Sequence, residues 1–239
     1  GEFLLNGQTL TLTGDSPIAR TNGILTSSTT SSLVFNANVN AYAFPDDIFL
    51  SAPMAFNNLT INRTGGVTLG NQSIIINGTL TLTAGIFDLN DNSITFQNGN
   101  TPISLAAGAL TTGPNTSITF GTIGNLGGNA FTIPNNLFTL SPTITNFNVH
   151  RTNQLTLNNQ DLTLSGNLAV TSGNFADAGR TIIVNGNVTM AGTHSGAGNI
   201  TLTGAGALPH EINGTGTYNN LILNDVLGAT VNSSFSVSG

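Results

Sequence analysis

The sequence predicts an all-β protein, a single-stranded parallel β-solenoid with about three short strands per coil. Residues 59–96 contain short apolar and polar alternations, such as VTL at 67–69 and LTL at 80–82, separated by Gly, Asn, Asp or Thr. These runs follow one another at steps of about six or seven residues, which is too short for a helix and fits a short strand plus a corner. A long internal repeat, in which no linker separates the copies, supports the same fold.

The repeat extends over the whole chain. Residues 61–99 align without a gap on residues 149–187, so that Arg63 meets Arg151. Self-similarity of this kind indicates stacked structural units rather than independent domains. We therefore expect residues 1–239 to form one continuous solenoid, which would be an excerpt of a longer repetitive protein or a subunit that stacks on its neighbours. The repeat units are 1–84, 85–172 and 173–239, the last of them incomplete.

The alternation assigns the inward side of each coil. Apolar residues at every second position would stack over their counterparts in the neighbouring coils, about 4.8 Å away. Thr68, Thr81 and Thr95, which lie between them, would point outward. The inward residues expected in the clearest stretch are Val67, Leu69, Ile74, Ile76, Leu80, Leu82, Phe87, Leu89, Ile94 and Phe96.

Asn and Gly are expected at the corners of the coils. Both tolerate positive φ, and an Asn side chain can bond the backbone locally or form ladders from coil to coil. Segments around Pro45, Pro134 and Pro209 are expected as irregular loops that leave the solenoid wall. The Asn-Gly pairs are Asn6-Gly7, Asn77-Gly78, Asn185-Gly186 and Asn213-Gly214.

The same Asn-Gly pairs would suit the hairpins of tandem β-sandwich domains, which are the alternative fold. We favour the solenoid because the repeat units follow one another without a linker. The strands are also shorter than those of most sandwiches.

Composition excludes several function classes. The chain has four cations, all of them arginine, and ten acidic residues, which give a net charge of -6. It therefore lacks the basic cluster that nucleic acid or an anionic membrane would require. Cysteine is absent, so no disulfide or thiolate metal site can form. No apolar run approaches the roughly 20 residues of a membrane-spanning helix, and residues 1–20 lack the layout of a signal peptide. We expect no nucleic-acid partner, no membrane insertion and no cofactor.

Carboxylates for polysaccharide chemistry are present but are not repeated. Enzymes built on β-helices place several carboxylates or a basic residue on one face of adjacent coils. Asp46-Asp47 becomes Asn135-Asn136 one repeat later, and Asp88 becomes Ala176 one repeat later. We therefore expect no enzyme and no catalytic residue, and a polysaccharide-active enzyme is an alternative. The candidate residues are Asp46, Asp47, Asp88, Asp91, Arg63 and Arg151.

Metal binding is not expected either. His150, His194 and His210 lie far apart in the sequence, without the spacing of a ligand set. Calcium-binding solenoids repeat a Gly-Gly-x-Gly-x-Asp motif, which this chain lacks. The sequence also has no phosphate-binding loop or nucleophile elbow.

Threonine offers a candidate binding surface. Two Thr-x-Thr-x-Thr runs occur, and stacked arrays of this kind on a solenoid are similar to ice-binding faces. Threonine is also a β-branched polar residue that suits any exposed strand position, which is the simpler interpretation. The candidate surface-binding residues are Thr9, Thr11, Thr13, Thr79, Thr81 and Thr83.

Several stretches resemble a known group of proteins. FNNLTINRTGGVTLG at 56–70, IIINGTLTLTAGIFDLNDNSITF at 74–96 and LTLSGNLAVTSGNF at 162–175 are similar to the repeats of large surface proteins and adhesins of Bacteroidota that the type IX system secretes. They are more distantly similar to β-helical repeats of filamentous-haemagglutinin-type exoproteins. The resemblance implies an extracellular or cell-surface location and a structural or adhesive role.

The function expected from these features is that of a stalk, a rod or a self-stacking filament subunit. Its partners would be itself, by end-to-end stacking, or neighbouring repeats of a longer chain. Glycans or solid surfaces are further candidate partners. An ice- or glycan-binding solenoid that uses the threonine-rich faces is an alternative function.

Overall fold

The computed structural model describes residues 1–50, 53–123, 127–204, 206 and 208–239. Every strand pair recorded in this part of the chain is parallel, and none of its residues lies in a helix. Hairpins of a β-sandwich would form antiparallel pairs. The predicted β-solenoid with about three strands per coil is therefore confirmed, and the sandwich alternative is wrong.

Contacts divide the chain into two compact units. Unit 1 comprises Gly1–Thr116 and Leu137–Thr139, and unit 2 comprises Ser117–Asn136 and Leu140–Gly239. The repeat borders after residues 84 and 172 stay a sequence prediction. They mark where the sequence repeat starts again, whereas the two units are defined by contacts between residues.

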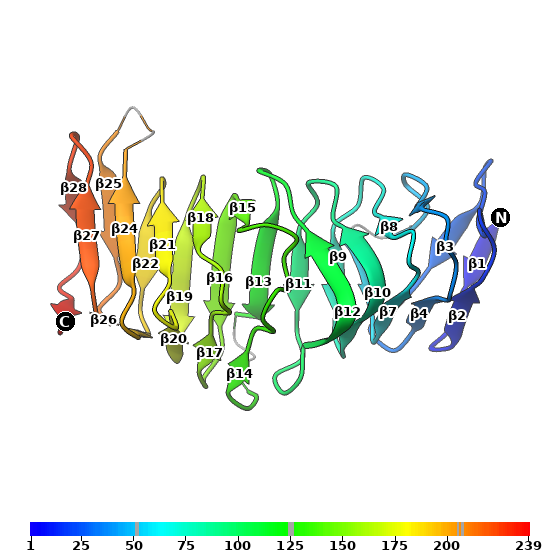
Figure 1. The fold of residues 1–239 in the computed structure, drawn as a ribbon, viewed down its shortest axis with the longest axis horizontal. Helices are drawn as coiled ribbons and strands as arrows, with labels where there is room; N and C mark the ends of the chain where they lie inside the picture. The colour runs from blue at the N-terminus through cyan, green and yellow to red at the C-terminus, as the bar shows by residue number, and fades with distance from the viewer. Residues whose placement is uncertain (51–52, 124–126, 205, 207) are drawn as a thin grey trace. The chain divides into compact units, whose positions relative to one another are not determined.

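Unit 1 is built from short parallel strands that form the walls of successive coils (Figure 1). One wall has the order β2-β4-β7-β10, a second has the order β5-β8-β10, and a third has the order β6-β9-β11. Strand β1 pairs with β3, and β12 pairs with β10. The strands are β1 (Glu2–Leu4), β2 (Thr9–Leu12), β3 (Ile24–Thr26), β4 (Ser32–Phe35), β5 (Tyr42–Ala43), β6 (Met54–Phe56), β7 (Leu59–Asn62), β8 (Val67–Thr68), β9 (Ile74–Ile76), β10 (Leu80–Asp88), β11 (Ile94–Phe96) and β12 (Ile103–Thr111).

Unit 2 has three walls, which are built from the strands of successive coils (Figure 1). The walls are β13-β16-β19-β22-β25-β28, β14-β17-β20-β23-β26-β29 and β15-β18-β21-β24-β27. The strands are β13 (Ser117–Gly121), β14 (Phe131–Thr132), β15 (Thr143–Ile144), β16 (Asn146–His150), β17 (Leu155–Thr156), β18 (Leu162–Leu164), β19 (Leu168–Ser172), β20 (Asn174–Ala176), β21 (Thr181–Val184), β22 (Val188–Met190), β23 (Thr193–Ser195), β24 (Asn199–Thr203), β25 (His210–Asn213), β26 (Thr217–Tyr218), β27 (Leu221–Asn224), β28 (Ala229–Val231) and β29 (Ser236–Val237).

The strand register shows the length of a coil. In unit 2, Phe147 pairs with Leu168, which pairs with Val188, which in turn is level with Ile212. These steps are 21, 20 and 24 residues long. Each step has the length of three short strands and three corners, which is one coil. The inward side chains of one coil therefore lie directly on those of the next.

The inward positions expected from the alternation are correct. All ten side chains are buried, and the most exposed of them, Leu69, is 4 % exposed. Thr68, Thr81 and Thr95 between them are only partly exposed, on the outer side. Period-two alternation decided these positions, because a short strand of a coil has one buried and one solvated face.

Two strands differ from the expected short runs. The alternations at 80–82 and 87–89 were expected as separate strands, but β10 is a single nine-residue strand that pairs with the nine-residue β12. Gly85, at φ 77°, bends β10 where it passes from one wall to the next. The ladder therefore continues around the corner, because glycine adopts this conformation without a steric penalty.

The Asn-Gly corners are only partly as expected. Asn6 and Gly7 have positive φ, and so does Gly214, whereas Gly78 and Gly186 do not. At Gly78, an added Cβ would lie 2.6 Å from the carbonyl oxygen of Asn57 in the preceding coil. Glycine is required there because two backbones approach closely, not because of the backbone angle.

An asparagine ladder confirms the coil-to-coil role expected for Asn. The N–H of Asn167 donates to Oδ1 of Asn146 (2.9 Å), and the N–H of Asn187 donates to Oδ1 of Asn167 (2.7 Å). The ladder continues to the N–H of Glu211, 2.9 Å from Oδ1 of Asn187. In unit 1, the N–H of Thr79 donates to Oδ1 of Asn58 (2.9 Å). Asn58 is the counterpart of Asn146, 88 positions earlier in the repeat. Each of these bonds gives an acceptor to a backbone N–H at a corner, where the hydrogen bonds between strands do not provide one.

The proline segments do not leave the wall as expected in two of the three cases. Phe44 and Ile133, which precede Pro45 and Pro134, are 4 % and 0 % exposed and belong to the core. Each segment makes a turn and remains packed on its own unit. Leu208, before Pro209, is 78 % exposed and fits the expectation.

Candidate functional site

The six predicted threonines lie on or beside one wall of unit 1, which contains β2, β4, β7 and β10. Thr9 and Thr11 are in β2, Thr81 and Thr83 are in β10, Thr13 follows β2, and Thr79 precedes β10. The register places Thr11 and Thr81 in one outward column, with Val34 and Thr60 between them and Ser104 beyond. Three strand steps separate Thr11 from Thr81, or about 14 Å.

This outward column, Thr11, Val34, Thr60, Thr81 and Ser104, is named the hydroxyl column. Within the described part of the chain, the hydroxyls of Thr11, Thr60 and Thr81 have no hydrogen-bond partner. Thr79 differs, because its hydroxyl donates to the carbonyl oxygen of Thr101 (2.8 Å). Thr83 lies where the register between β7 and β10 shifts. The structure thus places Thr11 and Thr81 in the same column. The residues between them, Val34 and Thr60, do not belong to the Thr-x-Thr runs.

Arg63 is buried and holds three coils of unit 1 together. Its side chain is 0 % exposed. Nε donates to the carbonyl oxygen of Asn40 (2.7 Å), and the two terminal nitrogens donate to those of Gly14 and Asp15 (2.8 Å each). The guanidinium carbon lies 5.5 Å from the centre of the Tyr42 ring. Such an arginine links backbone segments and is not accessible to a substrate.

Arg151 occupies the equivalent place in unit 2. It is 1 % exposed, one terminal nitrogen donates to the carbonyl oxygen of Asn129 (2.6 Å), and its guanidinium carbon lies 5.9 Å from the centre of the Phe131 ring. Burial lowers the pKa of Arg151 from its ordinary value. The repeat of Arg63 as Arg151 therefore preserves a packing role.

Asp47 lies at a corner of unit 1, where it pairs with an asparagine. Its N–H donates to Oδ1 of Asn71 (2.9 Å), and Nδ2 of Asn71 donates back to Asp47 Oδ1 (2.9 Å). Asn136 and Asn159 form the same reciprocal pair in unit 2, with both distances at 3.0 Å. Asp47 and Asn136 also share positive φ, 50° and 58°. Aspartate and asparagine are interchangeable here because both accept these bonds and tolerate this backbone conformation.

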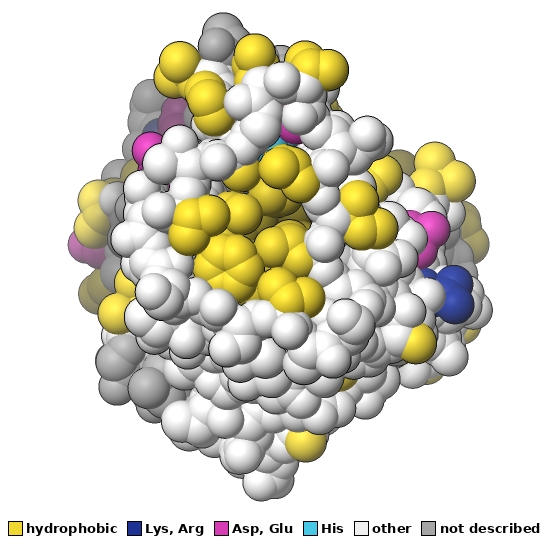
Figure 2. All heavy atoms as spheres, turned by 90° about the vertical axis from the view of Figure 1, so that its left-hand side faces the viewer, with side chains coloured by type: hydrophobic (Ala, Val, Ile, Leu, Met, Phe, Trp, Pro, Cys, Tyr) yellow, Lys and Arg dark blue, Asp and Glu magenta, His cyan; other side chains and the backbone are white. Residues whose placement is uncertain are grey.

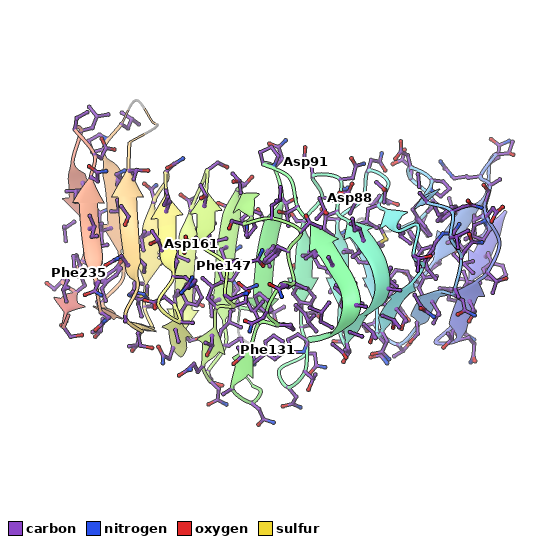
Figure 3. The ribbon with its side chains drawn as sticks, in the orientation of Figure 1. Asp88, Asp91, Phe131, Phe147, Asp161 and Phe235 are labelled. Atoms are coloured by element: carbon purple, nitrogen blue, oxygen red, sulfur yellow. The ribbon has the colours of Figure 1, made fainter. Side chains whose placement is uncertain are left out.

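Asp88 and Asp91 flank the turn after β10, as Figure 3 shows. Oδ1 of Asp88 accepts the N–H of Asn90 (2.9 Å), which is a local turn bond. The Asp91 carboxylate accepts both the N–H and the side-chain amide of Asn115, at 3.3 and 3.2 Å. Each carboxylate thus has a corner function that needs no substrate.

The three histidines are all buried in unit 2 but are not brought together. His150 is 9 % exposed, and its Nδ1 lies 2.7 Å from Oγ1 of Thr171. Burial lowers the pKa of His150. His194 and His210 each lie 2.8 Å from the carboxylate of an aspartate, Asp177 and Asp225. No group of three His, Asp or Glu side chains in the described ranges is arranged to hold a metal ion.

The Asp177–His194 pair lies inside the coils of unit 2, with both side chains 0 % exposed. Asp177 Oδ1 accepts the N–H groups of Gly179 (2.7 Å) and Gly198 (2.9 Å), and its Oδ2 accepts His194 Nε2–H. Three donors thus satisfy the hydrogen-bonding capacity of this buried carboxylate. The pair joins the corner after β20 to strand β23 of the next coil.

The His210–Asp225 pair has a different geometry. His210 Nδ1 donates to the carbonyl oxygen of Gly186 at 2.5 Å. Its Nε2 lies 2.8 Å from Asp225 Oδ2 but forms no hydrogen bond with it. The pair links β25 to the turn that follows β27.

Sequence reasoning missed both pairs. Asp177 has no acidic counterpart 88 positions earlier, where the chain has Leu89, so the repeat did not indicate it. The available signal was the substitution itself, because Asp177 and His194 interrupt apolar positions of the pattern. The buried role of Arg63 and Arg151 had a clearer signal, since an arginine that recurs without any other charge is typical of a structural position.

Comparison of the chain with protein-family models, with curated proteins and with solved structures found no match. In the described residues there is also no helix with the length and hydropathy needed to span a membrane.

Proposed function

We propose that the chain is a structural, non-enzymatic β-solenoid segment of a secreted or cell-surface repetitive protein, where it serves as a stalk, a rod or a self-stacking filament subunit. One observation supports this most directly. Four of the six charged side chains that could have carried chemistry, Arg63, Arg151, Asp47 and Asp91, form hydrogen bonds between coils. The resemblance to adhesin repeats supports the extracellular location.

Scattering from the purified 239-residue chain tests the stalk. A rod-like segment gives a pair-distance distribution with one short and one long dimension. A distribution typical of a compact globule would contradict the stalk. Incubation with a panel of acidic polysaccharides tests the non-enzymatic part, for which no cleavage is expected. Cleavage that disappears in Asp46→Asn and Asp47→Asn variants would overturn it.

Self-stacking is proposed from one end of unit 2. Figure 2 shows hydrophobic side chains gathered at the centre of this end, framed by uncharged atoms. Leu223, Val231 and Val237 occupy the inward columns of this coil and are about half exposed, at 51, 56 and 50 %. A second copy of the chain that places its own coil here would cover them and extend the parallel ladders.

A concentration series tests self-stacking. Sedimentation velocity and negative-stain electron microscopy are expected to show species that lengthen with concentration. Val231→Asp introduces a charge on this end at a partly exposed position and is expected to leave the chain folded but monomeric. Thr163→Asp, at an outward position of β18, is the control and should still assemble. A wild-type chain that stays monomeric at every concentration would contradict the proposal.

A second candidate function is binding through the hydroxyl column. Its unpaired hydroxyls lie at multiples of the strand spacing, with Val34 in place of a hydroxyl between Thr11 and Thr60. They favour a ligand with an array of hydrogen-bonding groups, of which ice is the proposed example. A thermal-hysteresis assay tests it. Activity is expected to be lost in Thr60→Lys and kept in Thr163→Lys. Absence of hysteresis in the wild type, or equal loss in both variants, would exclude this function.

A further inference from the structure

His194 occupies a place that belongs to apolar side chains. In the second wall of unit 2, the inward column runs through Phe131, Leu155 and Phe175. Phe175 pairs directly with His194, and the pairing of Thr193 with Thr217 puts Tyr218 next in the column. The imidazole is therefore stacked inside the core, 1 % exposed, and its two nitrogens must find partners within the protein.

The partners determine where the ring carries its proton. The backbone N–H of Asn219 points at Nδ1 from 3.3 Å, so Nδ1 must offer a lone pair. The proton then resides on Nε2, which donates to Asp177 Oδ2 at 2.8 Å. The neutral ring thus satisfies one acceptor and one donor, which lie in the coils before and after its own.

A second proton would break this arrangement. Protonated Nδ1 would present an N–H to the N–H of Asn219, and two donors repel each other. We propose that His194 is a proton-operated clasp: when the ring takes up a proton from solvent at Nδ1, it releases the N–H of Asn219 and loosens the coil that carries β26 from the coil that carries β23. This inference goes beyond the proposed structural role and does not depend on it.

The groups around the ring determine the pH at which the clasp opens. Asp177 faces the ring from the corner after β20, and Tyr218 faces it from β26, while β20 itself carries no titratable side chain. Burial lowers the pKa of His194, and the charge and hydrogen bond of Asp177 oppose this effect. Burial raises the pKa of Tyr218, so its phenol stays neutral in this range. The clasp is therefore expected to open at a pH below the ordinary histidine value of about 6.5.

Nuclear magnetic resonance on the isotope-labelled 239-residue chain tests the clasp without any substitution. The imidazole carbon-bound protons of His194 and the amide of Asn219 are followed from pH 8 to pH 5. Both are expected to titrate with one midpoint. The Asn219 amide, corrected for the intrinsic pH dependence of exchange, should lose about tenfold in protection, as for the loss of one hydrogen bond. Titration of the ring with an unchanged Asn219 amide would overturn the proposal.

A matched pair of variants separates the clasp from general acid sensitivity. His194→Phe keeps an aromatic ring in the column but cannot bind a proton, so the protection of Asn219 should become independent of pH in this range. His150→Gln removes another buried histidine of unit 2 and should leave the Asn219 response as in the wild type. If His194→Phe retained the response, or if His150→Gln abolished it, the clasp would be excluded.

Discussion

The two units share a coil plan but bury different side chains in the same column. In unit 1 the column of the second wall contains Tyr42, Val67 and Phe87. In unit 2 the same column begins with Phe131 and Leu155, equivalent to the first two, and later admits His194 and Tyr218. The repeated positions thus carry the packing of this column, whereas its buried histidine, His194, lies where the repeat has diverged.

The buried arginines show the conserved side of this comparison. Arg63 and Arg151 each lie over an aromatic ring and donate to backbone carbonyls. The aromatic partner differs, Tyr42 in one unit and Phe131 in the other, and the position of the guanidinium does not depend on the phenol. A repeat can therefore keep a buried arginine for as long as the backbone carbonyl acceptors stay in place.

The largest effect is expected where the two units agree. Phe87 and Phe175 are equivalent, and both are 0 % exposed. Replacing either with alanine leaves a cavity and should cost about 3–5 kcal/mol of unfolding free energy, measured by chemical denaturation. Ile86→Ala, at a side chain 45 % exposed, is the control and should cost much less. A cost that is large in one unit and small in the other would break the equivalence.

The second-largest effect is expected from the buried Arg63 of unit 1. Arg63→Met fills much of the same volume but leaves three carbonyl oxygens without their donor, so it should lower the unfolding free energy by about 3 kcal/mol. Arg20→Met is the control, because exposed Arg20 also donates to two carbonyl oxygens, those of Gly23 and Asp46, which water can reach. Similar costs for the two variants would show that burial of the arginine is unimportant.

Acid should separate the two units. All three histidines lie in unit 2. Burial lowers the pKa of His194 and of His150, so the folded state binds their protons less readily than the unfolded state. The stability of unit 2 should therefore be complete above about pH 6.5 and fall as the pH decreases through that value, whereas unit 1 should not respond in this range. Hydrogen exchange resolved by peptide at pH 7.5 and pH 5.5 measures both, and equal responses would contradict the comparison.

The smallest expected effect has opposite signs in the two units. The hydroxyl of Tyr218 is buried and has no hydrogen-bond partner in the described part of the chain, so Tyr218→Phe should raise the unfolding free energy by about 1 kcal/mol. The hydroxyl of Tyr42 donates to the carbonyl oxygen of Ile18 (3.1 Å), so Tyr42→Phe should lower it by about the same amount. Thermal unfolding compares the two, and a shift of the same sign in both would refute the assignment.

Much of the fold could be predicted from particular residues. The alternation at 67–96 correctly placed Leu80 and Phe87 inside, because strand geometry alone determines which side chains share a face. The 88-residue shift correctly paired Arg63 with Arg151. The path of β10 around Gly85 could not be predicted, because a corner with or without a break in the ladder has the same sequence pattern.

The candidate site was less predictable. The Thr-x-Thr runs identified Thr11 and Thr81, but Val34 and Thr60, which complete the hydroxyl column, come from strands without such runs. Registers between coils depend on the length of every intervening corner, and these corners vary from coil to coil. Local pattern therefore finds the strands of a column but not its complete membership.

The sequence by itself determined the strand period, the inward residues, the repeat and the absence of a basic or thiol site. These properties depend on local geometry and on composition, which do not require knowledge of distant neighbours. Only the tertiary structure decided that Asp47 is a corner residue, that Arg63 reaches the carbonyls of Gly14 and Asp15, and that His194 lies between Asp177 and Asn219. Each of these contacts joins residues about 17 to 49 positions apart, and coil stacking alone brings them within hydrogen-bond distance.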